Sequence, residues 1–198
     1  MDFILVILSY FIGNISFAYL LVKWKTKKDI RNFGSGNAGT TNVLRVLGKK
    51  YAVLVLLGDV FKGVAAILLA KAFASNEITV VLSGLAVIAG HNWPAFMGFR
   101  GGKGIATSIG VFMMYDPMAA LICIGIGVGL IALTRYVSLG SITGVALLPF
   151  IIYFLRGVGL PLAFALVISV FSVYRHRGNI KRLLQGNENK LGQKKPIE

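Results

Sequence analysis

The sequence is poor in the residues from which most metal and thiol sites are built: it contains one cysteine, two histidines and seven acidic residues. Because Cys123 is alone, an internal disulfide and a paired-thiolate metal site are both excluded. It lies within an apolar run, so we expect it to be a packing residue. His91 and His176 have no cluster of carboxylates beside them, which argues against a bound metal ion. We therefore expect no metal and no other cofactor.

Charged residues are scarce as well: they make up 14% of the chain, whereas hydrophobic residues make up 56%. This composition is far outside the usual range of soluble domains. The charge is also one-sided, with a net value of +14 at pH 7. The basic residues alternate with apolar runs of membrane length instead of forming a soluble face studded with aromatic residues, which argues against nucleic acid. The expected partners are membrane lipid and small anionic molecules, with no nucleic acid.

Long apolar runs are what the sequence has instead. They lie at 3–22, 51–73, 78–98, 104–115, 118–134, 138–155 and 158–174. Several are only just long enough to cross a hydrocarbon core of about 30 Å. The sequence thus predicts an all-α integral membrane protein with seven transmembrane helices. It is expected to be a single polytopic domain over residues 1–198, with a polar cytoplasmic tail from about residue 186. The first run lacks the basic start and cleavage site of a signal peptide, so we expect it to be retained.

Basic residues set the predicted orientation, because the cytoplasmic loops of membrane proteins collect Lys and Arg. With the N-terminus outside and the C-terminus in the cytoplasm, all of them except Lys62, Lys71 and Arg156 fall on the inner side. The inner residues are Lys23, Lys25, Lys27, Lys28, Arg31, Arg45, Lys49, Lys50, Arg100, Lys103, Arg135, Arg175, Arg177, Lys181, Arg182, Lys190, Lys194 and Lys195. Asp116 and Pro117 are predicted to form a tight outer turn, because proline cannot continue an unstrained helix.

Glycine is abundant, with 24 residues, many of them inside the predicted helices, as at Gly125, Gly127 and Gly129. Lipid provides no hydrophobic drive for helices to associate, so small residues that allow close backbone approach stabilise helix pairs. We expect these glycines to lie at contacts between helices.

The stretch Gly34–Arg45, in the first predicted inner loop, has the composition of an anion-binding loop. Its glycines let successive backbone N–H groups turn toward an anion. Thr40 or Thr41 is expected to cap a short amphipathic helix whose positive end points the same way. Arg45 follows about one turn further on and can bind a phosphate through two N–H groups. The lysine of a P-loop is missing, which argues against ATP hydrolysis. The alternative is an ordinary glycine-rich loop.

Two further stretches lie where predicted helices begin at the inner face. Gly90–Gly104 closes the third run and opens the fourth, and Arg135–Ser141 opens the sixth. The positive N-terminal ends of both helices are therefore candidate anion sites. Ser138 or Ser141 is expected to cap the sixth helix or to donate to an oxyanion. His91 is either a ligand-binding imidazole or a hydrogen-bonded residue beside a proline kink.

A third stretch, Arg175–Glu188, follows the last apolar run. Its basic residues suit a positive-inside anchor, but that role does not account for His176, Asn179 and Glu188.

Asp59 and Lys62 stand three residues apart inside the second run, so they share a helix face. Neither charge would be tolerated against lipid, so both are expected to point into the bundle and pair with each other or with a substrate. A structural ion pair is the favoured interpretation.

Three of these stretches, in this order, resemble the motifs of the bacterial acyl-phosphate:glycerol-3-phosphate acyltransferases, the PlsY family. They are Gly34–Arg45, Gly90–Thr107 and His176–Glu188, and the sequence Asp59–Gly63 also matches. The similarity spans nearly the whole chain, and three separate motifs are more specific than one glycine loop. At Arg100 the family more often has lysine, and arginine keeps the charge.

The resemblance implies a multi-pass protein of the bacterial plasma (inner) membrane whose active site faces the cytoplasm. It implies transfer of a fatty acyl group from acyl phosphate to the 1-hydroxyl of sn-glycerol 3-phosphate, giving lysophosphatidic acid and inorganic phosphate. This is the first acylation of bacterial phospholipid synthesis, and it uses neither acyl-CoA nor acyl carrier protein. We expect the protein to function as a monomer. The candidate catalytic residues are His176, Asn179, Lys103 and Ser141. The candidate substrate-binding residues are Ser35, Gly36, Asn37, Thr40, Thr41, Asn42, Arg45, His91, Gly102 and Glu188.

These residues suit direct attack of the glycerol hydroxyl on the acyl carbonyl. Two phosphates repel each other strongly where water is scarce, and groups such as Arg45 and Lys103 offset that repulsion. Which residue holds which phosphate stays open. No Asp follows His91 or His176 at the spacing used by ordinary glycerolipid acyltransferases. We expect the hydroxyl proton to pass to a phosphate oxygen of the donor, with His176 and Asn179 orienting the glycerol phosphate. The alternative base is His176 itself or His91.

Two other classes of protein compete with this interpretation. A transporter of organic phosphates also needs intramembrane charge and phosphate loops, but it predicts polar residues throughout the membrane depth, whereas the conspicuous groups here crowd toward one face. A basic scaffold held at anionic lipids explains Lys23–Lys28 but not the glycine loops. The sequence favours the enzyme.

Overall fold

The computed structural model describes residues 1–193, so Lys194 and Lys195 of the predicted inner set lie outside the described residues. Helices make up the whole of the regular structure in the described part, as expected. They are α1 (Asp2–Asn14), α2 (Phe17–Thr26), α3 (Thr40–Leu47), α4 (Lys49–Phe73), α5 (Glu77–Asn92), α6 (Ile105–Tyr115), α7 (Pro117–Thr134), α8 (Val137–Arg156), α9 (Leu160–Arg175) and α10 (Arg177–Leu184). Two 3-10 turns join them, η1 (Ile30–Asn32) and η2 (Ala95–Met97).

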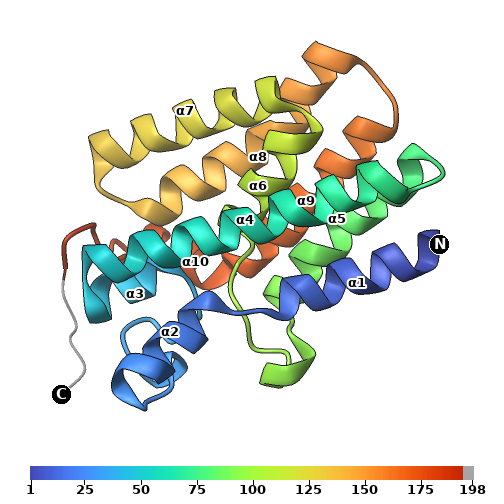
Figure 1. The fold of residues 1–198 in the computed structure, drawn as a ribbon. Helices are drawn as coiled ribbons and strands as arrows, with labels where there is room; N and C mark the ends of the chain where they lie inside the picture. Colours follow the sequence, from blue (N-terminus) through green and yellow to red (C-terminus); the bar gives the residue numbers. More distant parts are fainter. Residues whose placement is uncertain (194–198) are drawn as a thin grey trace.

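The apolar helices α1, α4, α5, α6, α7, α8 and α9 lie side by side in a bundle and run alternately in opposite directions (Figure 1). Within residues 1–193, five helical segments are long and apolar enough to cross a membrane: Asp2–Thr26, Lys49–Phe73, Glu77–Met97, Pro117–Thr134 and Val137–Arg156. Two further apolar helices, α6 and α9, are shorter. Each predicted apolar run thus overlaps at least one α-helix, while the count of seven spans stays a prediction.

The first apolar run is not one continuous helix, so the expectation for 3–22 is wrong. α1 ends and α2 begins two residues later, with the Ser16 side chain capping α2. Lys62 of α4 donates hydrogen bonds to the freed carbonyls of Gly13 and Ile15, at 3.1 and 2.8 Å. A break inside an apolar segment is tolerated because another helix provides partners for the backbone groups.

Close packing between α7 and α8 depends on glycine at one face of each helix. A Cβ atom added to Gly140 would overlap the carbonyl of Gly127, so this pair confirms the expected role of glycine. A Cβ atom added to Gly125 or Gly129 would meet nothing within 4 Å, so the same expectation is wrong for them. Gly125 and Gly129 are four residues apart and share one face of the helix, whereas Gly127 points in a widely different direction, and it is the Gly127 face that meets α8.

The predicted turn at Asp116 is present. Pro117 opens α7, and the Asp116 carboxylate accepts hydrogen bonds from the Ala119 N–H at 3.1 Å and from Arg156 at 2.7 Å. This ion pair ties the start of α7 to the end of α8.

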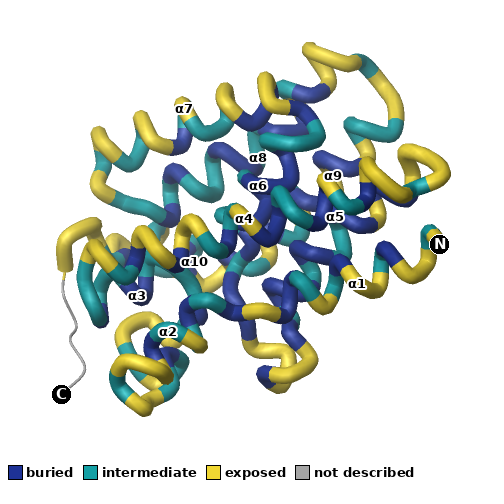
Figure 2. The backbone as a smooth tube through the Cα atoms, viewed as in Figure 1, coloured by how far each residue is buried: buried dark blue, intermediate teal, exposed yellow. Residues whose placement is uncertain are grey.

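Residues 1–193 contain two groups of buried apolar residues. The larger runs through the bundle from α4 and α5 to α8 and α9. The smaller packs α3 against α2, η1 and the start of α4 through Val22, Ile30, Val43, Val46 and Val55. Full burial of such a side chain contributes about 1.5–3 kcal/mol, so α3 is fixed as a support for the loop before it. Figure 2 shows exposed residues along the outer face of α7, and many are apolar, such as Leu121, Val128 and Leu133, as lipid contact requires.

Candidate active site

A polar cavity of about 330 Å³ lies at the end of the bundle where α7 and α9 end and α6 and α8 begin. Three stretches far apart in sequence meet there, as the predicted motifs required. The predicted site residues on its wall are Ser35, Asn37, Thr40, Thr41, Asn42, Arg45, His91, Lys103, Ser141, His176, Asn179 and Glu188. Their placement together fits one site, while their individual roles stay predictions.

Two predicted binding residues do not line the cavity. Gly36 has a φ of 73° and its N–H donates to the Phe33 carbonyl at 3.0 Å, so it shapes the turn of the loop. The N–H of Gly102 donates to the His91 carbonyl at 3.0 Å, and its carbonyl accepts from Arg175 at 2.7 Å. Both glycines therefore shape the backbone behind the wall.

Asn42 holds the glycine loop in place from below. It is 1% exposed, and its Oδ1 accepts from the Ser35 N–H at 2.8 Å. Its Nδ2 donates to the carbonyls of Phe33 and Asn37 at 2.9 and 3.0 Å. Because the amide is committed to backbone, Asn42 fixes the loop that presents Ser35 and Asn37 to the cavity.

The helix caps expected from threonine and serine do not form. Gly39 is the N-cap of α3 and Tyr136 that of α8, and neither makes a side-chain capping bond. A cap must precede the first helical residue, whereas Thr40, Thr41, Ser138 and Ser141 already lie within the helices. The first N–H groups of α3 therefore lack a side-chain cap beside the cavity, which suits an anion.

A chain of hydrogen bonds links Lys103 to the last motif. The Lys103 ammonium donates to Oδ1 of Asn179, and Asn179 Nδ2 donates to Glu188 at 2.9 Å. The second Glu188 oxygen accepts from Arg182 at 2.8 Å. Asn179 and Glu188 are both 7% exposed. Glu188 thus orients Asn179, and through it Lys103, at the edge of the cavity.

Around Lys103, positively charged side chains outnumber negatively charged ones. Burial, together with the neighbouring Arg182, Arg45 and Arg175, lowers the pKa of Lys103 to about 8 against the opposing effect of Glu188. Burial also lowers the pKa of the Arg45 guanidinium, and Arg182 acts in the same direction. Crowded, half-desolvated cations of this kind are stabilised by a bound anion.

His176 is held as a neutral imidazole. It is 4% exposed, and burial together with the charge of Lys103 lowers its pKa to about 4. Its Nδ1 lies 2.7 Å from the Ser172 carbonyl, which can only accept, so Nδ1 carries the proton. Nε2 then keeps its lone pair for another partner.

Asp59 and Lys62 form the expected buried pair, with Nζ 3.0 Å from Oδ1 and both side chains 2% exposed. Lys62 also lies 2.8 Å from Nδ1 of His91, besides the two carbonyls at the break between α1 and α2. Since an ammonium only donates, Nδ1 of His91 must accept and its proton lies on Nε2. His91 is therefore hydrogen-bonded within the bundle and also lies on the cavity wall, so its two interpretations are compatible.

Arg175 is a structural residue that the sequence did not single out. Its guanidinium donates to the carbonyls of Gly101 and Gly102 and lies 5.5 Å from the centre of the Trp93 ring. It fixes the loop that carries Lys103. In the sequence it was indistinguishable from an anchor residue, because its partners are backbone carbonyls of another segment.

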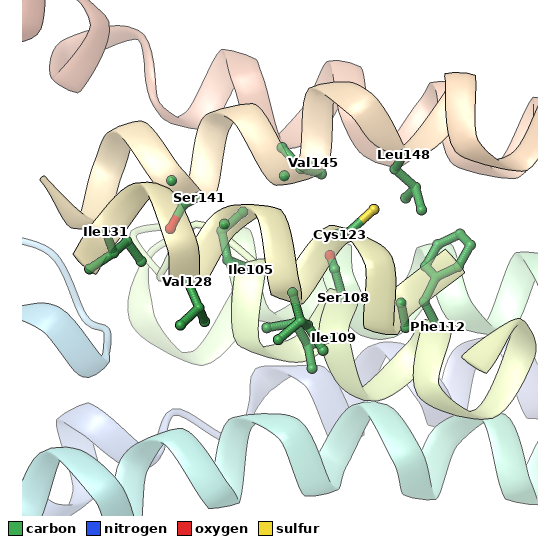
Figure 3. A pocket seen from close by; sticks show the side chains of 15 residues that line it. Ile105, Ser108, Ile109, Phe112, Cys123, Val128, Ile131, Ser141, Val145 and Leu148 are labelled. Carbon is green, nitrogen blue, oxygen red and sulfur yellow. The ribbon is translucent and has the colours of Figure 1, made fainter. Parts of the chain in front are cut away.

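An apolar channel of about 140 Å³ adjoins the polar cavity, between α6, α7 and α8, and sequence reasoning missed it. Both spaces are lined by Ile105, Ile109, Val128, Ile131 and Ser141. Figure 3 shows Ile131 and Ser141 at one end of this channel and Phe112 and Leu148 at the other. The polar cavity thus continues into a space lined by apolar side chains, which suits a hydrocarbon chain.

Comparison with known proteins shows which family the chain belongs to. The sequence profile described as Glycerol-3-phosphate acyltransferase matches residues 3–186. The chain belongs to the PlsY family of glycerol-3-phosphate acyltransferases. It is 51% identical to the glycerol-3-phosphate acyltransferase of Thermoanaerobacter pseudethanolicus over 192 residues, covering 97% of this chain and 96% of the relative. The enzyme of Clostridioides difficile is 47% identical over 199 residues, with the same coverage.

Two solved structures of the family have the same fold. One is PlsY (YgiH), an integral membrane glycerol 3-phosphate acyltransferase, in its glycerol 3-phosphate form, with a TM-score of 0.90, 43% identity and 96% coverage of both chains. The other is its lysophosphatidic acid form, with a TM-score of 0.87, 41% identity and coverage of 97% of this chain and 96% of that one. The resemblance drawn from the three motifs is confirmed, and the chain is an integral membrane acyltransferase of this family.

Proposed function

We propose that this protein transfers a fatty acyl group from acyl phosphate to the 1-hydroxyl of sn-glycerol 3-phosphate, releasing lysophosphatidic acid and inorganic phosphate. The observation that carries the proposal is a cavity with Arg45 and Lys103 on its wall that continues into an apolar channel. Acyl phosphate has this division, with a charged head and a hydrocarbon tail. The nucleotide of acyl-CoA is bulky, and a cavity of about 330 Å³ is a poor fit for it.

The reaction needs two phosphates in one cavity, and the surrounding groups offset their repulsion. Arg45 and the uncapped start of α3 offer donors on one wall, and Lys103 offers a charge on another. Ser141 lies where the cavity meets the channel, beside the expected position of the acyl carbonyl. Positioning and electrostatic stabilisation of the developing oxyanion then supply most of the rate.

The chemical step is a direct exchange of one carbon–oxygen bond for another. The glycerol oxygen bonds to the acyl carbon, the bond from that carbon to the phosphate oxygen breaks, and the hydroxyl proton moves to the departing phosphate. His176 accepts a hydrogen bond from the hydroxyl through Nε2, and Asn179 orients the glycerol phosphate. Glu188 acts through Asn179, since a carboxylate would repel a phosphate in direct contact.

The membrane setting follows from the distribution of charge. The end of the bundle that holds the cavity also carries Lys103, Arg135, Arg175 and the basic helix α10. By the positive-inside rule, we place this end in the cytoplasm and the N-terminus outside. The bacterial plasma membrane and a functional monomer are the setting that the family resemblance implies.

A phosphate transporter receives less support from the geometry. Beyond the polar cavity, the continuing space is lined almost entirely by apolar side chains, through which a phosphate would not pass. The intramembrane charges Asp59 and Lys62 are tied to each other and to carbonyls instead of marking a path.

The first test uses purified protein in detergent with sn-glycerol 3-phosphate and palmitoyl phosphate, with acyl-CoA as a parallel donor. We expect phosphate and lysophosphatidic acid to appear in equal amounts from acyl phosphate alone. Product from acyl-CoA and none from acyl phosphate would overturn the donor assignment. No product from any donor, with the protein folded, would favour the transporter.

The role of His176 is tested by His176→Gln, in which the side-chain amide takes the place of an imidazole. The amide oxygen is a weaker acceptor than the Nε2 lone pair and the proton itself goes to phosphate, so kcat should fall about tenfold, the equivalent of one hydrogen bond of about 1–1.5 kcal/mol. The melting temperature serves as a control for folding, because His176 is buried. Near-normal turnover and affinity in a folded variant would contradict the assignment.

A further inference from the structure

The end of the apolar channel is closed by a packed aromatic wall. Phe112 is 2% exposed and stacks on Phe164 with ring centres 5.1 Å apart, and Tyr115 meets it edge-on at 5.9 Å. Leu148 of α8, 4% exposed, lines the channel at the same end (Figure 3). Phe164 is itself 1% exposed, so the Phe112 ring has no free space into which it could swing. The position of this end is therefore fixed by the packing of the bundle.

The depth of the channel follows from the helices that line it. Residues 105–112 of α6 and 141–148 of α8 each advance about 10 Å at a rise of about 1.5 Å per residue, and 120–131 of α7 advance about 16 Å. An extended hydrocarbon with bonds of about 1.5 Å advances about 1.3 Å per carbon, so the channel holds about 8 to 13 carbons. With about three further carbons of the acyl group in the polar cavity, a chain of about 11 to 16 carbons reaches the end wall.

A closed channel end discriminates against acyl chains that are too long, but not against shorter ones. The acyl chain enters from lipid, which is as apolar as the channel, so each further carbon inside gains little. A chain that overruns the wall must bend back or displace packed side chains, and one excess methylene in a rigid pocket costs about 10-fold or more in rate. The expected profile is nearly flat for short chains and falls steeply beyond one length.

We propose that Phe112 and Leu148 set the maximum length of the acyl chain that the enzyme transfers. The inference rests on the proposed function, because it assumes that the acyl group of the donor occupies the channel. It assigns a specificity role to residues outside the three motifs, at the opposite end of the channel from Ser141.

The experiment measures kcat/KM for saturated acyl phosphates of ten to twenty carbons at a fixed concentration of sn-glycerol 3-phosphate. The unmodified enzyme should vary little up to about 16 carbons and lose at least about tenfold at twenty. In Phe112→Ala, the drop in kcat/KM should move by about two to four carbons toward longer acyl chains, since the side chain removed is about that long. Phe112→Leu keeps more of the packing and should move the drop in kcat/KM by fewer carbons. It tests the same prediction if Phe112→Ala does not fold.

Two further variants separate channel length from general damage. Val145 lines the channel between its ends and is 8% exposed, so Val145→Phe should move the fall toward shorter chains. Ile152 is fully buried one turn beyond Leu148 and does not line the channel. Ile152→Ala should lower the melting temperature and leave the chain-length profile unchanged.

The outcomes distinguish this inference from the function on which it rests. No transfer from acyl phosphate of any length would refute the proposed donor. Transfer with the same profile in the unmodified enzyme, Phe112→Leu and Val145→Phe would refute the role of the end wall and leave the donor intact. A flat profile to twenty carbons in the unmodified enzyme would also refute it, and would mean that the chain leaves the channel toward lipid beside the exposed Val128.

Discussion

Replacing Lys62 by Met should destabilise the protein by about 3–5 kcal/mol, the usual cost of leaving one partner of a buried ion pair alone. The ammonium touches Asp59, His91 and the carbonyls of Gly13 and Ile15. An ammonium has only three protons to donate to these four acceptors. Oδ1 of Asp59 is the acceptor that is left without a hydrogen bond of good geometry. Its removal therefore leaves a buried carboxylate uncompensated and two carbonyls without partners.

The measurement is thermal unfolding of purified protein in detergent. Lys71 lies on the same helix, is exposed and donates to one carbonyl, so Lys71→Met is the matched control and should change stability by no more than about 0.5 kcal/mol. The double variant Asp59→Asn with Lys62→Met should regain part of the loss, because the lone carboxylate is gone. Equal melting temperatures for the Lys62 and Lys71 variants would show that the cluster does not hold the break between α1 and α2.

Replacing Lys103 by Ala should lower kcat/KM by about 10²- to 10³-fold, as for the loss of one donor aimed at a developing negative charge. The ammonium lies on the cavity wall, donates to Asn179 and feels the positive charges of Arg182, Arg45 and Arg175. Burial and these neighbours lower its pKa to about 8, so the free enzyme carries the charge below pH 8 and loses it above. The value of kcat/KM should therefore decline above pH 8 by up to about tenfold per unit.

Lys103→Arg is the control for this pH dependence. Arginine stays charged throughout this range, so the alkaline decline should disappear even though the geometry of the guanidinium lowers the overall rate. His176, with a pKa of about 4, stays neutral above pH 6 and should add no inflection between pH 6 and 9. An unchanged decline in Lys103→Arg would assign it to another group.

The sequence determined the class of the fold and the composition of the site. The apolar runs predicted every bundle helix, because hydrocarbon leaves a backbone no alternative to internal hydrogen bonds. The three motifs identified the family and most of the residues that gather at the cavity, from Ser35 to Glu188. This was possible because polar residues in a membrane protein are retained chiefly for function. The pairing of Asp59 with Lys62 followed from helical spacing alone.

Only the tertiary structure decided features whose partners are distant in sequence. The break after α1 depends on Lys62, the orientation of Asn179 on Glu188, and the loop before α6 on Arg175. Local patterns misplaced the caps of α3 and α8 and two glycines of α7, because a cap needs the residue just before the helix and a glycine contact needs a facing neighbour. The channel and its end wall were invisible for the same reason. An apolar residue has one signature in sequence, whether it faces lipid or a bound chain, and only packing separates the two.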